Sequence, residues 1–152
     1  MARYRVPVYS QQTLALCWEA CGKMMWHWRH KNLNDYGKKA GDYLKLNKGL
    51  TEEEMDLFYK QLGLRSLPHP KGANLRHALR WSPVIFTEIG KGPGHAMVAG
   101  GYDDKTRKYT VINPCLVQVV DFGGGPNTCA QGTIPREIRK VDRQLGKYIW
   151  YW

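Results

Sequence analysis

Apolar residues in the first part of the chain recur every three or four positions, which is the spacing of one face of an α-helix. This spacing predicts a helix over residues 14–28 with one buried face. The next segment, residues 34–46, has a weaker helical pattern because Gly37 and Gly41 interrupt it. The residues of the first apolar face are Leu14, Cys17, Trp18, Cys21, Met24, Met25 and Trp28.

A capping motif marks a third helix. Thr51 and Glu54 have the spacing of a capping box, in which each side chain accepts a hydrogen bond from the other residue's backbone N–H. A second apolar face follows, and Gly63 is an expected helix stop. The pattern therefore predicts a helix from Thr51 to Gly63, and a shorter one is expected over residues 74–80. The second face consists of Met55, Phe58, Tyr59 and Leu62.

The second half of the chain is rich in β-branched and aromatic residues, in short runs separated by glycine, proline and aspartate. Helices followed by strands indicate an α+β fold, with N-terminal helices packed on a C-terminal, mainly antiparallel sheet. The length of 152 residues fits one domain over residues 1–152. The predicted strands are 82–89, 95–102, 108–113, 116–122 and 147–152.

The net charge of +10 favours acidic partners, but the basic residues are scattered along the chain. We therefore expect a solvated basic surface and no nucleic-acid partner. The first ten residues lack the apolar core of a signal peptide, so we expect synthesis in the cytoplasm. No run of 18 apolar residues predicts a membrane span, and no membrane partner is expected.

The four cysteines form no CxxC pair. A fourth zinc ligand beside Cys17 and Cys21 is not evident, so we expect neither a metal nor a cofactor. Cys115 and Cys129 could pair in an oxidising compartment or stay free. Cys21 is expected in the core, whereas Cys17 fits either core packing or a nucleophile.

Two features favour the interpretation of Cys17 as a nucleophile. Cys17 lies near the predicted start of the first helix, where the helix dipole stabilises a thiolate. Gln11 lies six residues earlier, and its amide could form an oxyanion hole with the Cys17 backbone N–H. Gln12 is the alternative donor. Trp18 and Gly94 are candidates for substrate contacts, although Trp18 fits packing beside the site as well.

His95 is the candidate base. It follows a glycine-rich turn and begins a predicted strand, and Asn113 ends the next one. If Asp103–Thr106 closes a hairpin between these strands, His95 and Asn113 lie opposite each other within one residue. Cross-strand neighbours are about 5 Å apart, which suits an amide that orients an imidazole.

These residues resemble the motifs of the papain-like cysteine peptidases. The resemblance rests on Gln11, Cys17-Trp18, Gly94-His95-Ala96 and Asn113-Pro114. It is closest to compact bacterial members, namely bacteriocin-leader-processing peptidases and secreted effector proteases. The resemblance implies that Cys17 is the nucleophile, His95 the base, Asn113 its orienting residue and Gln11 an oxyanion donor.

The resemblance also implies a protein or peptide substrate, with cleavage after a Gly-Gly pair as one hypothesis. A delivered effector toxin, with a dedicated secretion route and a cognate immunity protein, is the expected biological setting. Two alternatives stay open. The same machinery serves deamidases, acyltransferases and amidases, and a basic binding module with an inactive triad fits the charge.

Overall fold

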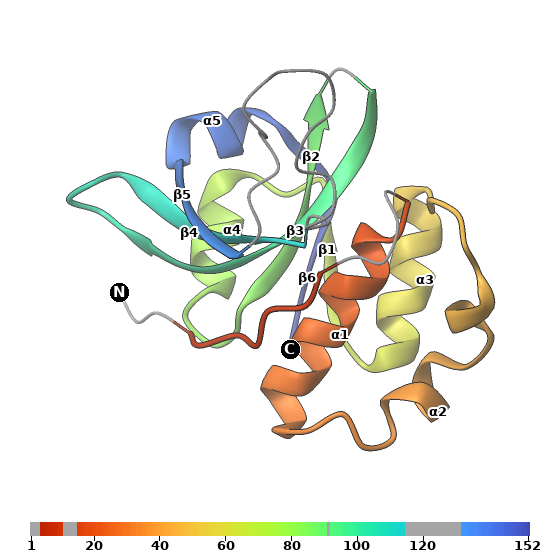
Figure 1. Ribbon diagram of the computed structural model, residues 1–152. Helices are drawn as coiled ribbons and strands as arrows, with labels where there is room; N and C mark the ends of the chain where they lie inside the picture. The colour runs from red at the N-terminus through yellow and green to blue at the C-terminus, as the bar shows by residue number, and fades with distance from the viewer. Residues whose placement is uncertain (1–3, 11–14, 91, 115–131) are drawn as a thin grey trace, which may run out of the picture.

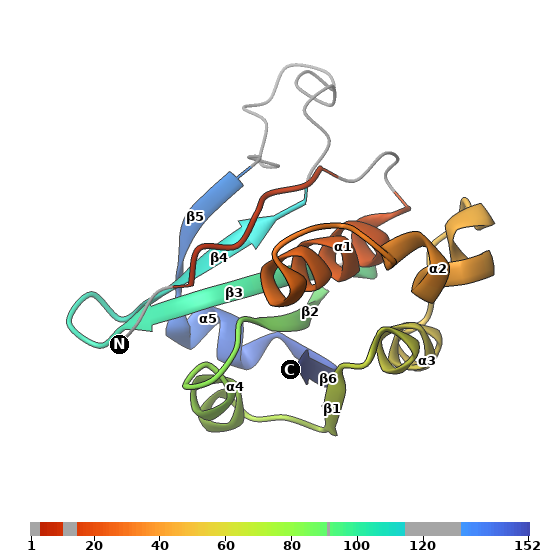
Figure 2. The same ribbon diagram turned by 90° about the horizontal axis from the view of Figure 1, so that it is seen from below.

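The computed structural model describes residues 4–10, 15–90, 92–114 and 132–152. In these residues six antiparallel strands form one sheet, ordered β1-β6-β2-β3-β4-β5. Helices α1 and α3 lie on one face of the sheet and α4 and α5 on the other (Figures 1 and 2). The predicted α+β class is confirmed. The strands are β1 (Arg65–Pro68), β2 (Val84–Gly90), β3 (Gly92–Asp103), β4 (Lys108–Asn113), β5 (Gly132–Glu137) and β6 (Leu145–Tyr151), and the helices are α1 (Cys17–His30), α2 (Tyr36–Ala40), the 3-10 helix η1 (Gly41–Lys45), α3 (Glu52–Leu62), α4 (Gly72–Ala78) and α5 (Ile138–Arg143).

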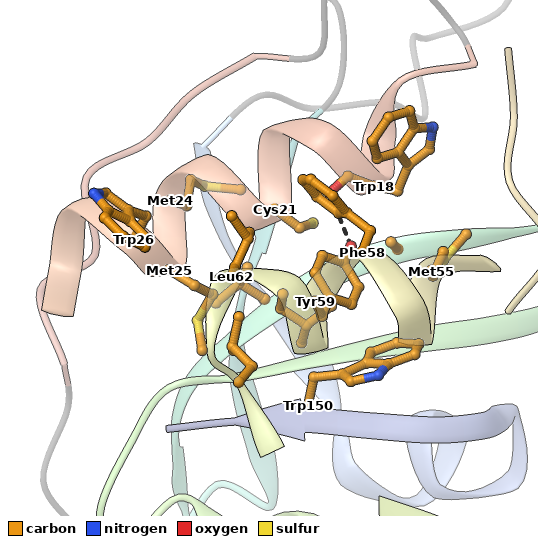
Figure 3. Packing of buried hydrophobic residues seen from close by; sticks show 14 of the residues in the cluster. Trp18, Cys21, Met24, Met25, Trp26, Met55, Phe58, Tyr59, Leu62 and Trp150 are labelled. Atoms are coloured by element: carbon orange, nitrogen blue, oxygen red, sulfur yellow. Dashed lines mark hydrogen bonds between the residues drawn. The ribbon is translucent and has the colours of Figure 1, made fainter. Parts of the chain in front are cut away.

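The larger core lies between the α1–α3 pair and the sheet, as Figure 3 shows. Trp18 of α1 and Phe58 of α3 meet edge to face, with their ring centroids 5.0 Å apart. The buried Tyr59 hydroxyl donates a hydrogen bond of 2.8 Å to the Trp18 carbonyl. Burial of each such aromatic side chain contributes about 2–3 kcal/mol, so this packing fixes the start of α1.

The helices follow the predicted pattern, except that one predicted helix is divided into two elements. The capping box is present, because Glu54 N–H donates to Thr51 Oγ1 at 3.1 Å and Thr51 N–H donates to Glu54 Oε1 at 3.0 Å. Helix α3 ends at Gly63, as predicted. The helix expected over 34–46 is split into α2 and η1, because Gly41 has a φ of +57° that an α-helix cannot contain.

Three elements were not predicted from the sequence, namely β1, α5 and β5. The two strands are the edges of the sheet, and each contains a proline, Pro68 or Pro135. Proline argues against a central strand but is tolerated at an edge, where no ladder hydrogen bond is lost. The strand predicted over 116–122 lies outside the described residues.

The register predicted for the β3–β4 hairpin is wrong by two residues. The loop is two residues longer than expected, since Asp103 pairs with Lys108 and not with Thr106, and an irregularity between Ala99 and Gly101 then moves the pairing back by one residue. Continued along the ladder, Asn113 falls opposite Met97. His95 is then a diagonal neighbour of Asn113 on the same strand pair.

Within the described part of the chain, no helix is both long enough and apolar enough to cross a membrane.

Candidate active site

Cys17 is the first residue of α1, as the apolar spacing predicted to within a few residues. The Tyr59–Trp18 hydrogen bond holds this end of the helix against α3. The Cys17 side chain is almost fully buried, and its Sγ accepts a hydrogen bond from the backbone N–H of Ala96 at 3.5 Å. The thiol is therefore held between the positive end of a helix dipole and the start of the strand that carries His95.

His95 lies between Cys17 and Asn113. Its Nε2 donates to Asn113 Oδ1 over 2.6 Å, and the Cys17 side chain lies close enough to the ring to raise its pKa. Because Nε2 is used by the amide, Nδ1 is the nitrogen available to the thiol. Asn113 is itself buried, with 6% of its surface exposed, so the amide holds the imidazole in one orientation.

The pKa of His95 is raised above its ordinary value of 6.5. Burial of the ring is the largest single influence and lowers the pKa. It is outweighed by the hydrogen bond and charge of Cys17, by the hydrogen bond to Asn113 and by the charge of Glu88. These partners stabilise the imidazolium form, which is the form that can pair with a thiolate.

Glu88 is a neighbour of His95 that the sequence analysis missed. The two residues pair across β2 and β3, and the Glu88 carboxylate forms an ion pair with Arg136 of β5. The glycine-rich turn between the predicted strands could have indicated the cross-strand pair. No local signal could have indicated Arg136, because β5 itself was not predicted.

Cys17 and His95 border a pocket of 830 Å³, whereas Asn113 lies behind His95 and is not part of its lining. Cys17 and His95 are on its wall, together with residues from the start of α1, the loop before α3 and the end of β2. Its lining is mostly apolar. The remaining lining residues are Ala15, Trp18, Gly49, Leu50, Thr51, Glu52, Met55 and Ile89.

Among the other predicted contacts, Trp18 borders the pocket but is fully buried, and its indole N–H donates to the Lys48 carbonyl at 3.0 Å. It forms part of the pocket's packed wall, in keeping with the packing interpretation. Gly94 lies in β3, directly before His95. Gln11 and its alternative Gln12 lie outside the described residues, as do Cys115 and Cys129.

Cys21, one turn after Cys17, has a different environment. It is completely buried in the core between α1 and α3. Burial raises its pKa well above the ordinary value, and the nearby Cys17 and Glu19 raise it further. A thiol in this position stays protonated and packs as a small apolar side chain.

Among the residues that the structure describes, no group of three or more His, Cys, Asp or Glu side chains is placed to hold a metal ion. The groups that contact Cys17 directly or through His95 include an imidazole, the Asn113 amide and the Ala96 backbone N–H. This set can hold an ion pair and transfer a proton.

The structure resembles solved peptidase domains. The peptidase domain of Streptococcus ComA, a bifunctional ABC transporter, superposes with a TM-score of 0.65 and 14% identity over 96% of both chains. A C39-like peptidase from Bacillus anthracis superposes with a TM-score of 0.63 and 14% identity, and the alignment covers 98% of this chain and 95% of the other. A double glycine motif protease from an AMS/PCAT transporter, solved with a leader peptide, superposes with a TM-score of 0.60 and 14% identity. The alignment covers 99% of this chain and 94% of the other. At this identity the likeness shows the fold.

No curated protein sequence matches the chain significantly. A family model does match, and it covers residues 1–122, which include the start of α1 and all of β3 and β4. Its description is papain-like cysteine protease AvrRpt2. The match spans most of the chain and agrees with the fold of the solved peptidase domains. The chain therefore belongs to this family of papain-like cysteine proteases.

Proposed function

We propose that the protein is a cysteine peptidase in which Cys17 is the nucleophile, His95 the acid and base, and Asn113 the residue that orients His95. The single observation that carries the proposal is the continuous contact from the Cys17 thiol through the imidazole to the Asn113 amide, at the wall of a pocket. A nucleophile, a base and an orienting group in this order are the parts that acyl transfer requires.

In the first step the Cys17 thiolate attacks the carbonyl carbon of the scissile bond, and the negative charge moves to the carbonyl oxygen. The His95 imidazolium then donates its Nδ1 proton to the leaving nitrogen as the C–N bond breaks. Water, deprotonated by the neutral imidazole, attacks the thioester carbon. The C–S bond breaks, and the thiolate and imidazolium are restored.

The negative oxygen needs hydrogen-bond donors. The first N–H groups of a helix have no intrahelical acceptor, so the Cys17 backbone N–H at the start of α1 is one donor of the proposed oxyanion hole. Gln11 is the proposed second donor, on the basis of its six-residue spacing from Cys17.

We extend the proposal to the biological setting on the resemblance to secreted effector proteases. The protease would be made in the cytoplasm and delivered into a competitor or host cell, where it cuts a cytosolic protein. A producer that meets its own protease needs an inhibitor, so an immunity protein is the proposed partner. One structural neighbour is described as a double glycine motif protease, which supports testing Gly-Gly sequences as substrates.

The experiment that tests the function is a proteome-wide comparison of a cell lysate treated with wild type or with Cys17→Ala. New N-termini that require Cys17 are the expected result. A gain of about 1 Da at glutamine, without new N-termini, would instead assign a deamidase, since hydrolysis of a side-chain amide replaces NH₂ with OH. Cys21→Ala is the matched control, because it removes a thiol from the same helix.

A further inference from the structure

The pocket beside Cys17 contains one charged group that the proposed chemistry does not use. Glu52, the first residue of α3, lines the pocket together with several apolar residues. Leu50, Met55 and Ile89 are among these residues, and Ile89 is well exposed at the rim of the pocket. A carboxylate at the edge of an apolar pocket is matched by a ligand with an apolar stem and a charged end.

The Glu52 carboxylate is held in place by two donors. Its Oε1 accepts the backbone N–H of Lys147 at 2.9 Å and the hydroxyl of Thr87. Gly146 lies beneath it, since a Cβ at this residue would be 2.1 Å from Oε1. The position of the carboxylate is therefore fixed by β2 and β6, and it is not a freely moving surface side chain.

The charge of Glu52 lacks the cation that its neighbours have. Glu53 binds Lys147 Nζ at 2.8 Å, and Glu54 lies 3.8 Å from Lys48 Nζ. Within the described ranges no side-chain nitrogen of Lys, Arg or His lies within 4.0 Å of a Glu52 oxygen. The Lys147 ammonium is bound to Glu53, which raises the pKa of Lys147 most, and the charge of Glu52 helps to raise this pKa further. The pocket thus contains a half-buried negative charge in a chain whose net charge is +10.

We propose that Glu52 determines specificity by binding a lysine or arginine side chain of the substrate, at a position that flanks the scissile bond. The aliphatic stem lies against Leu50, Met55 and Ile89, and the cationic end binds the Glu52 carboxylate. The inference rests on the proposed peptidase function, because the pocket also contains Cys17. A neutral side chain of the same length loses the ion pair, and an acidic one is repelled.

The first test is a positional-scanning library of octapeptides, cleaved by wild type, Glu52→Gln and Glu53→Gln. Glutamine at residue 52 keeps an oxygen for Lys147 N–H and Thr87 but removes the charge. Wild type is expected to prefer Lys or Arg over norleucine by about tenfold at one position next to the cleavage site. Glu52→Gln is expected to lose this preference, whereas Glu53→Gln, in the same helical turn, keeps it.

The second test needs no peptidase activity. Cys17 is modified with cationic aminoethyl methanethiosulfonate or neutral methyl methanethiosulfonate, and the rates are measured at Cys17 by peptide mass spectrometry. Glu52→Gln is expected to lower the ratio of cationic to neutral rates by about threefold or more, because the negative charge beside the thiol is lost. Glu53→Gln is expected to leave the ratio near that of wild type.

The outcomes separate the two proposals. If no peptide is cleaved in a Cys17-dependent way, the peptidase function fails, and the modification rates still decide the role of Glu52. Three results would each overturn the inference. Wild type could show no preference for Lys or Arg in the library, the preference could survive in Glu52→Gln, or the ratio of modification rates could be the same in Glu52→Gln and wild type.

Discussion

His95 and Asn113 are joined by a hydrogen bond of 2.6 Å between Nε2 and Oδ1, inside a part of the protein where Asn113 is almost fully buried. The bond uses one ring nitrogen and leaves Nδ1 for Cys17. Since an imidazole that rotates by half a turn would exchange its two nitrogens, this amide determines which nitrogen meets the thiol.

The role of Asn113 is tested by two substitutions. Asn113→Ala removes the orienting oxygen, and we expect kcat to fall by roughly 10- to 100-fold with little change in KM. Asn113→Asp keeps an oxygen and adds a negative charge, which raises the pKa of His95. Activity should largely return, with the alkaline limb of the pH–rate profile moved to higher pH.

Steady-state kinetics over a range of pH checks both variants. Equal losses in Asn113→Ala and Asn113→Asp, with an unmoved alkaline limb, would show that Asn113 contributes packing and does not orient the base.

The two cysteines of α1 are expected to differ sharply in their contribution to activity. Cys17→Ala should lower kcat/KM by about 1,000-fold or more, because the nucleophile is lost. Cys21→Ala should keep most of the activity and lower the free energy of unfolding by about 1 kcal/mol, because a buried sulfur leaves a small cavity. Peptide hydrolysis and urea unfolding measure the two effects, and comparable activity losses would refute the assignment.

The raised pKa of His95 predicts a pH-dependent stability. A group whose pKa is raised on folding stabilises the protein fully below its unfolded pKa, and this contribution is lost as pH rises through the folded pKa. The difference in unfolding free energy between wild type and His95→Gln should therefore shrink as pH increases from below 6.5.

Urea unfolding of both proteins across this range measures the difference, and NMR titration of the His95 ring gives the pKa directly. In Cys17→Ala the pKa of His95 should fall, because the thiol partner is lost and burial remains. A difference in stability that grows with pH would contradict the account.

Gly146 is predicted to be required for the close packing of β6 against Glu52 and Thr87. A Cβ at this residue would lie 1.9 Å from Thr87 Oγ1 and 2.1 Å from Glu52 Oε1. Gly146→Ala should lower the free energy of unfolding by roughly 1–3 kcal/mol, since the backbone of β6 must shift. At the exposed Gly37 in α2, a Cβ meets nothing within 4 Å, and alanine there should stabilise by roughly 0.5 kcal/mol.

Thermal or urea unfolding of the two alanine variants checks the contrast. A Gly146→Ala protein as stable as wild type would show that the contact between Thr87, Glu52 and β6 does not fix the carboxylate.

The contact between His95 and Asn113 could be predicted from the sequence even though the register was wrong by two residues. Diagonal neighbours on a strand pair are still within reach of long polar side chains, so the prediction tolerated the error. A first helix over residues 14–28, with Cys17 near its start, and the helix after Thr51 were predicted from apolar spacing and the capping motif, and α1 begins three residues later than predicted.

Other parts of the site depend on contacts that local sequence does not encode. Glu52 is positioned by the backbone of β6, which lies 95 residues later in the chain, and Glu88 by Arg136 on an edge strand. Neither partner has a motif of its own. Long-range pairing determines these positions, and a pattern with a period of two or 3.6 residues carries no information about it.

The most direct measurement for the Cys17–His95 pair is the rate at which iodoacetamide alkylates Cys17 at about pH 6, resolved by residue with mass spectrometry. Only the thiolate reacts, so the rate reports how well the imidazolium stabilises it. We predict fast alkylation of Cys17 in wild type, a fall of about tenfold or more in His95→Ala, and no reaction of the buried Cys21 in the folded protein. A Cys17 that reacts slowly at this pH, or at the same rate without His95, would contradict the account.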